Sequence, residues 1–319
     1  MKDERKRLSV VVSVYNEELA LKDFYKEINR VLDTIQWDYE IVFVNDGSID
    51  GSKEILKEFV RDSKKVKVIN FTRNYGHEAA MIAGVDCAKG DAVVCMDADL
   101  QHPPVCIPEI IEKLEEGYNV INMVRTKNED VGIIKKITSA GFYMVLNMMS
   151  PVKFENNASD FFAIDKKVIN VMKCQYRERI RFLRGFIQNV GFHRTTIEYE
   201  AAKRVAGESK YSIRKLMKFS INTLFSFSDM PLKLGIYSGC ITAIFGFVLM
   251  IYTIVNKIFF QVPAGYSTII VFLSFMFAVL MIIIGVIGEY ISILFTEIKE
   301  RPIYLIDEIL ENDGCKDGK

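Results

Sequence analysis

The sequence predicts an α/β fold with a doubly wound, mostly parallel sheet, followed by two membrane-spanning helices. Three observations carry this prediction. Strand-like β-branched runs alternate with helical periodicity between Leu8 and Val124. Polar clusters directly follow several of these runs, and ligands bind at the carboxyl ends of the strands in such sheets. Two long uncharged stretches then occupy the last third of the chain.

Strands and helices are expected to alternate along the first part of the chain. Apolar residues recur at helical spacing between Glu17 and Ile35, whereas Leu8 to Val14 is a β-branched run. The expected elements are strands over 8–14, 39–44, 66–71, 92–96 and 120–124, alternating with helices over 17–35, 51–60, 77–88 and 104–116. Further on, we expect a helix over 132–149, then a short strand and a helix over 160–173. Short connections between strands and helices favour a parallel sheet.

The overall composition excludes some classes of protein. The chain has 319 residues, with 41 basic and 41 acidic side chains, so its formal net charge is zero and no bulk nucleic-acid binding is expected. The six cysteines form no CxxC pair, which favours reduced thiols in a body that faces the cytosol. The charged first residues run straight into a strand, without the apolar core of a signal peptide.

The uncharged stretches predict a membrane hairpin. No charged residue occurs between Lys233 and Lys257, or from Ile258 to Gly288. Either stretch is long enough for a helix to cross a hydrocarbon core of about 30 Å. Two buried core helices of a soluble domain are the alternative, but spans of this length without charge are uncommon in soluble folds. Before them, residues 203–218 are basic and amphipathic, as in helices that lie on anionic membrane surfaces.

The flanks of the hairpin indicate its orientation. Lys233 and the basic cluster precede it, and Lys299 and Arg301 follow it, whereas the link between the spans has one basic residue. By the positive-inside rule, both termini are cytoplasmic and the link is outside. The expected organisation is a catalytic domain over 1–203, an amphipathic segment over 204–232, a transmembrane hairpin over 233–297 and a cytoplasmic tail over 298–319.

A pair of carboxylates ends the strand expected over 92–96. Asp97 and Asp99 are two residues apart, and Gln101 adds a neutral oxygen at the same spacing. Such oxygens suit Mg²⁺ or Mn²⁺, which keep positions open for a substrate's phosphate oxygens. We therefore expect these three residues to hold a metal that binds a diphosphate and neutralises the leaving group. A surface turn with acids by chance is the alternative.

Two further strand ends are polar. Tyr15, Asn16 and Glu17 follow the first strand, and Asp46 follows the second. Asp46 either bonds a base or ribose or belongs to an ordinary strand–helix turn, and the sequence leaves both interpretations open. The three histidines, His77, His102 and His193, are too scattered for a metal site, and only His102 adjoins the acid pair.

Several motifs together resemble a known family. They are SVYNEE (13–18), VNDGSIDGS (44–52), RNYGHEAAMIAG (73–84), MDADLQHPP (96–104), SDFFAIDKKV (159–168), RFLRG (181–185) and RVAGESKYS (204–212). Their order resembles that of polyprenyl-phosphate glycosyltransferases of glycosyltransferase family 2, and the chain looks like bactoprenol glucosyltransferases, relatives of dolichol-phosphate mannose synthase. The resemblance runs from about Leu8 to about Ile309. Ser13 departs from the usual proline, which we expect to affect only the stiffness of that turn.

The resemblance implies a GT-A fold and inverting transfer of a sugar from a nucleotide diphosphate, with uridine diphosphate and glucose favoured, to a polyprenyl phosphate in the membrane. The metal is Mg²⁺ or Mn²⁺ on Asp97, Asp99 and Gln101. The implied roles are nucleotide-sugar binding by Tyr15, Asn16, Glu17, Asp46 and Asp97, acceptor-phosphate binding by Arg204 and Lys210 with Arg125 and Arg184 as weaker candidates, and catalysis by Asp99 and Asp160. A phosphate monoester has a second pKa of about 6, so we expect Asp160 to orient groups as much as to take a proton.

Other functions remain in view. A processive polysaccharide synthase would carry a QxxRW motif, which is absent from the sequence. A non-catalytic membrane scaffold would have no need of the acidic, basic and glycine motifs. A flippase or transporter would need more than two spans without charge pairs, unless homo-oligomers form. The sequence leaves the sugar, the nucleotide and the oligomeric state open.

Overall fold

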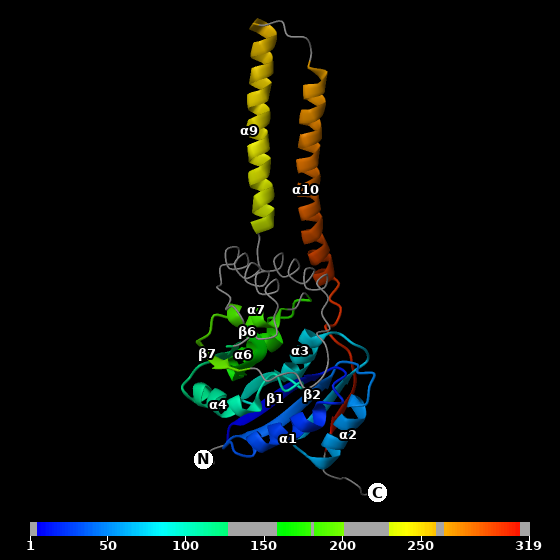
Figure 1. Cartoon of the computed structure of the whole chain (residues 1–319), viewed down its shortest axis with the longest axis vertical. Helices are drawn as coiled ribbons and strands as arrows, with labels where there is room; N and C mark the ends of the chain where they lie inside the picture. The colour runs from blue at the N-terminus through cyan, green and yellow to red at the C-terminus, as the bar shows by residue number, and fades with distance from the viewer. Residues whose placement is uncertain (1–4, 127–157, 180–181, 201–229, 260–264, 313–319) are drawn as a thin grey trace. The chain divides into compact units, whose positions relative to one another are not determined.

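The computed structural model describes residues 5–126, 158–179, 182–200, 230–259 and 265–312, and the chain forms two compact units (Figure 1). The first unit contains the described residues up to Glu200 together with residues 301–312. The second contains the two long helices. The segment after the second long helix therefore belongs to the same unit as the start of the chain.

The first unit is built on an eight-stranded sheet in the order β7-β5-β6-β4-β1-β2-β3-β8. The strands are β1 (Arg7–Val14), β2 (Asp38–Asn45), β3 (Val66–Phe71), β4 (Ala92–Asp97), β5 (Val120–Arg125), β6 (Ala158–Asp165), β7 (Arg194–Tyr199) and β8 (Ile306–Glu311). The pairs β1–β2, β1–β4, β2–β3 and β5–β7 are parallel. Strand β6 runs antiparallel to β4 and β5, and β8 runs antiparallel to β3. The predicted GT-A-like α/β fold with a mostly parallel sheet is confirmed.

Helices cover both faces of the sheet. Successive side chains of a strand point to opposite faces, and apolar side chains on both faces need to be covered. The helical segments of this unit are α1 (Leu21–Leu32), α2 (Ser52–Asp62), α3 (His77–Cys87), η1 (Pro104–Cys106), α4 (Ile107–Glu115), α6 (Lys166–Cys174) and α7 (Leu183–Asn189). Val10 and Val12 of β1 join the core formed with α1, α2 and α4. Val11 faces α3, where a Cβ on Gly84 would lie 2.1 Å from a Val11 methyl carbon, so this close packing requires glycine.

The predicted elements agree with the structure in kind and differ at some ends. Strand β3 has the expected bounds. Helix α1 begins at Leu21 rather than at residue 17, because the Glu17 carbonyl accepts bonds from the Ala20 and Leu21 amides in a preceding turn. The expected helix over 104–116 is divided into η1 and α4. Strands β7 and β8 were not predicted, and the segments 132–149 and 203–218 lie outside the described residues.

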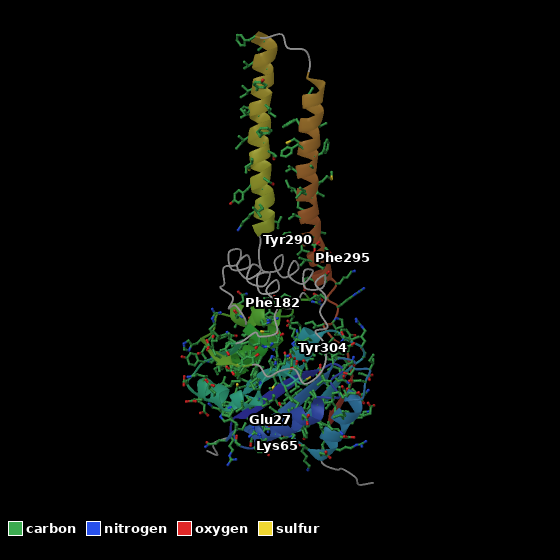
Figure 2. All side chains as sticks on the ribbon, in the orientation of Figure 1. Glu27, Lys65, Phe182, Tyr290, Phe295 and Tyr304 are labelled. Atoms are coloured by element: carbon green, nitrogen blue, oxygen red, sulfur yellow. The ribbon has the colours of Figure 1, made fainter. Side chains whose placement is uncertain are left out.

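Strand β8 is bound to the sheet by side chains as well as by its ladder. The Glu308 carboxylate lies 2.9 Å from Lys53 Nζ, and Glu311 pairs with Lys67. Just before the strand lies Tyr304, which is labelled in Figure 2. Its hydroxyl donates to Asp86 Oδ2 over 2.7 Å. The Tyr304 ring also stacks on a phenylalanine of β3, so the segment after the second long helix is fixed to the first unit.

The second unit contains α9 (Met230–Phe259) and α10 (Tyr266–Ile298), which contact each other through Phe245 and Phe272, with ring centroids 6.3 Å apart. Both helices are long and apolar enough to cross a membrane, by length and composition. Their apolar side chains project outward along both helices (Figure 2), and Ile241 and Ile282 are 67% and 68% exposed. Such exposure disagrees with the alternative of two buried core helices.

Candidate active site

The loops after β1 and β2 are bonded to each other. The Asn16 side-chain oxygen accepts from the Ile49 amide over 2.9 Å, and the Asn16 amide donates to the Ser48 hydroxyl over 3.0 Å. The Glu17 amide donates to the Ser52 hydroxyl over 3.0 Å. Asn16 has a positive φ of 54°, a conformation that asparagine tolerates better than most residues. The predicted nucleotide-sugar residues of the first loop are therefore held against the second loop at one edge of the sheet.

Asp46 fixes the loop that precedes α3. Its two carboxylate oxygens accept from the amides of Tyr75 and Gly76 over 2.6 and 2.9 Å, and the residue is 2% exposed. The adjacent Gly47 has φ of +66°, and a Cβ there would lie 2.6 Å from the Arg73 backbone. Asp46 thus has a structural role at this strand end, while its bond to a nucleotide stays a prediction.

The acid pair lies in a tight turn after β4. Asp99 Oδ1 accepts from the Gln101 amide over 3.0 Å, and Leu100 between them has φ of +61°. A left-handed conformation at leucine costs roughly 1–2 kcal/mol and persists only where the surroundings fix it. Asp97 and Asp99 differ in exposure, since the Asp97 side chain is 30% exposed and Asp99 is buried.

His102 is hydrogen-bonded to the backbone of this turn. Its Nδ1 accepts from the Asp97 amide over 2.9 Å, so the proton of the neutral ring is on Nε2. The ring is buried and stacks on Phe161 with centroids 5.3 Å apart. Burial outweighs the nearby carboxylates and lowers the pKa of His102. A neutral ring in this position supports the turn through its backbone bond and its packing.

Gln101 and Arg125 connect the turn to β5 and β7. The Gln101 side-chain oxygen accepts from Arg125 Nη2 over 3.1 Å, and Arg125 Nε donates to the Tyr199 hydroxyl over 3.1 Å. Arg125, expected as a weaker acceptor-phosphate candidate, therefore lies beside the predicted metal turn. The Gln101 side-chain oxygen lies in the same neighbourhood and accepts one bond from Arg125, so its role as a metal ligand stays a prediction.

His77 lies between Asp97 and Asp160. Its Nδ1 is 2.9 Å from the Ser13 hydroxyl and 3.4 Å from Asp97 Oδ1, and its Nε2 is 3.6 Å from Asp160 Oδ2. Burial alone would lower the pKa of His77, but the carboxylates around it outweigh burial and raise the pKa. Burial would likewise raise the pKa of Asp97, but His77 and the hydrogen bond from the Ser13 hydroxyl hold it below its usual value.

Asp160 also pairs with Arg184 of α7. Asp160 Oδ1 lies 2.8 Å from Arg184 Nε, so the two carboxylate oxygens face an arginine and a histidine. Glu78, next to His77, accepts from the Leu183 amide at the start of α7 over 2.9 Å. Burial, reinforced by Asp160, raises the pKa of Glu78 to about 7. The start of α3 therefore contacts both the acidic turn and the helix that carries Arg184.

The residues of the turn fit a hard cation that shares its coordination with a substrate. Within the ranges that the structure describes, no three His, Cys, Asp or Glu side chains are arranged to hold a metal by themselves. Asp97 and Asp99 supply two carboxylates from one turn, and Mg²⁺ is commonly bound through one or two carboxylates plus substrate phosphates. The donor set therefore fits a cation that arrives with a diphosphate.

The structure brings together most of the predicted site. Asp97, Asp99, Gln101, Arg125, Asp160 and Arg184 all lie in one network, whereas Arg204 and Lys210 lie outside the described residues. Sequence reasoning missed the roles of Ser13, His77 and Glu78. Ser13 does more than alter the stiffness of its turn, because its hydroxyl donates to Asp97 Oδ1 over 2.9 Å. Its position near the carboxyl end of a buried strand was the available signal.

Comparison with known proteins gives consistent matches along the chain. Residues 9–172 match the model of glycosyl transferase family 2. An uncharacterized glycosyltransferase, YkcC of Bacillus subtilis (strain 168), is 42% identical over 301 residues, which cover 94% of this chain and 93% of that protein. The SfII prophage-derived bactoprenol glucosyl transferase of Shigella flexneri is 37% identical over 301 residues, covering 94% of this chain and 97% of the relative.

A solved structure, that of mannosyl-3-phosphoglycerate synthase from Rubrobacter xylanophilus, is also similar to this chain. It has a TM-score of 0.49 and 14% sequence identity, and the match covers 69% of this chain and 72% of that one.

Proposed function

Because the chain belongs to glycosyltransferase family 2, we propose that it transfers a sugar, most simply glucose from uridine diphosphate glucose, to undecaprenyl phosphate. The observation that carries this proposal is the 37% identity to a bactoprenol glucosyl transferase over 94% of the chain, because that length includes both apolar helices. The product, a lipid-linked sugar, would serve glycan modification in the cell envelope.

The proposed reaction is a single inverting displacement. An oxygen of the acceptor phosphate attacks the anomeric carbon, the bond from that carbon to the donor diphosphate breaks, and the nucleoside diphosphate leaves. Asp97 and Asp99 are the residues that would hold Mg²⁺ or Mn²⁺, which supplies positive charge to the diphosphate. The loops at Tyr15–Glu17 and Asp46 would bind the nucleotide beside this turn, supported by their mutual hydrogen bonds.

Asp160 is proposed to orient the reacting groups. The acceptor phosphate has a second pKa of about 6, so it is largely a dianion at neutral pH and needs no strong base. Asp160 already faces Arg184 on one oxygen and His77 on the other. A carboxylate held between two such groups is suited to fixing their positions and to hydrogen-bonding the sugar. Arg204 and Lys210 are the proposed ligands of the acceptor phosphate.

The membrane topology is proposed from the sheet. Strands β1 to β7 precede the α9–α10 hairpin and β8 follows it, yet all eight strands belong to one sheet. Both ends of the hairpin must then be on the same side of a membrane that the two helices cross. Lys233, Lys299 and Arg301 favour the cytoplasmic side for both ends, with the enzyme body and both termini.

The test is direct transfer in membranes. Membranes containing the full chain are incubated with undecaprenyl phosphate and a panel of radiolabelled nucleotide sugars, and the lipids are separated by chromatography. We expect a labelled lipid with one donor, lost in membranes carrying the D97A/D99A variant. Label in soluble or polymeric products, with none in the lipid fraction, would contradict the proposal.

A further inference from the structure

The His77 ring connects two parts of the site that are far apart in the sequence. Ser13 lies near the end of β1, His77 begins α3, Asp97 ends β4 and Asp160 lies on β6. The ring is within 3.6 Å of a side-chain atom of each of the other three. Histidine presents two ring nitrogens that point in different directions from one short rigid ring.

The hydrogen bonds assign a direction to this connection. The Ser13 hydroxyl has one proton, which it donates to Asp97 Oδ1 over 2.9 Å. Its 2.9 Å contact with His77 must then have Nδ1–H of the ring as the donor. The opposite nitrogen, Nε2, is 3.6 Å from Asp160 Oδ2. One edge of the ring is therefore linked to Asp97 by hydrogen bonds through Ser13, and the other edge faces Asp160.

The backbone at His77 is fixed from both sides. The preceding residues Tyr75 and Gly76 donate their amides to Asp46, and Gly76 has φ of +98°. The following residue, Glu78, accepts from the Leu183 amide of α7. The fixed backbone therefore fixes the place from which the His77 ring projects. A side chain that sets the distance between two other groups needs such a fixed position.

We propose that His77 is a positioning residue that sets the distance between Asp97 and Asp160. Asp97 acts at the donor diphosphate, and Asp160 acts on the acceptor side. This inference rests on the proposed function. It predicts that the two edges of the ring have separable effects, on donor binding through Ser13 and on turnover through Asp160.

Two substitutions separate the edges. In H77N the amide nitrogen takes the place of Nδ1 and can still donate to Ser13, but it does not extend to Asp160. In H77Q the longer amide reaches the place of Nε2 and leaves Ser13 without its partner. H77A removes both contacts, and S13A removes only the link to Asp97. H193N is the matched control, because His193 is exposed and stacks on Tyr118 away from the site.

The measurements use the full chain in lipid nanodiscs. Calorimetry gives the affinities for Mn²⁺ in the presence of uridine diphosphate and for uridine diphosphate glucose, and radiolabel transfer gives kcat. We expect H77N to keep both affinities within about threefold and to lose kcat by about ten- to a hundredfold, the usual effect of one charge-assisted contact. H77Q and S13A should instead weaken Mn²⁺ and donor binding by about tenfold, and their loss of kcat should be smaller than that of H77N.

The proposal is overturned if H77N, H77Q and H77A all match the wild type. It is also overturned if the three lose binding and kcat equally with a common fall in melting temperature, as for a purely structural residue. If the wild type forms no lipid-linked sugar, the proposed function fails. The contrast between H77N and H77Q in Mn²⁺ affinity and in slow hydrolysis of the nucleotide sugar then still decides the role of His77.

Discussion

Arg184 Nε lies 2.8 Å from Asp160 Oδ1, and the two side chains are equally exposed, at 26%. In the proposed reaction a phosphate dianion approaches this carboxylate, so Arg184 offsets a repulsion that would otherwise oppose acceptor binding. We expect R184A to raise the KM for undecaprenyl phosphate by about ten- to a hundredfold, with donor affinity preserved. Transfer kinetics with varied lipid, together with donor calorimetry, measure this.

The double variant R184A/D160N identifies the cause. If Arg184 acts by neutralising Asp160, removing the carboxylate should restore much of the acceptor KM. A double variant with the same KM as R184A would instead assign Arg184 to direct phosphate binding, as the sequence resemblance implies.

Removal of the acid pair should abolish transfer. Because Asp97 and Asp99 are the two carboxylates of the turn, D99A is expected to show no transfer at any practical Mn²⁺ or Mg²⁺ concentration, and D97A to be severely impaired. Chelator should have the same effect on the wild type, reversed by added metal. D62A, a charge loss at the far end of α2, is the control. Full activity of the wild type in excess chelator would refute metal dependence.

Glu78 should make stability depend on pH. Its pKa is raised from 4.5 to about 7 in the folded chain, so the folded state binds more protons than the unfolded state between these values. The stabilisation is fully present below pH 4.5 and is lost as the pH rises through 7, by about 3–4 kcal/mol in all. E78Q keeps an acceptor for the Leu183 amide, so its melting temperature should fall less than that of the wild type between pH 5 and 8.

The exposed variant E54Q is the control for this measurement and should follow the wild type across the pH range. Identical pH dependence in E78Q and the wild type would show that Glu78 does not titrate in this interval.

The hairpin topology can be tested by cysteine labelling. In a background without native cysteines, A264C in the link between the two long helices should react with an impermeant reagent in intact cells. K64C in the sheet unit should react only after permeabilisation, because both ends of the hairpin lead to that unit. The reverse pattern would place the enzyme body outside.

Arg204 should affect the lipid acceptor more than the donor. It belongs to the basic segment before the first long helix, which is predicted to lie at the membrane surface, where a polyprenyl phosphate presents its headgroup. R204A is expected to lower kcat/KM for the lipid by about ten- to a hundredfold, while donor affinity stays nearly unchanged. R5A is the charge-matched control. A collapse of donor affinity with unchanged lipid dependence would assign Arg204 to the diphosphate instead.

Much of the fold could be predicted because its signals are local. Strand β3 is a short, mostly apolar segment with the expected bounds, and α1 has its apolar residues at helical spacing. Strand β8 was missed because three of its six residues, Asp307, Glu308 and Glu311, are acidic, and its partner strand lies far away in the sequence. An edge strand with one solvated side has a weak pattern of its own.

The site was predictable only where one short segment carries the signal. Asp97 and Asp99 stand together after one strand, so their proximity could be read from spacing. The role of His77 depends on contacts with three separate elements. A single histidine in a predicted helix does not by itself indicate a function. Ser13 gained its importance from its neighbours on β4 and α3, which the linear sequence does not place beside it.

The position of β8 limits when the sheet can be completed during synthesis of the chain. The ribosome makes β3 early, but the strand that covers its outer edge emerges only after both long helices. Until then the edge of β3 presents unpaired amides and carbonyls, which are prone to pair with other chains. The enzyme body therefore completes its sheet only once the hairpin has been translated, which couples its folding to the arrival of the chain at the membrane.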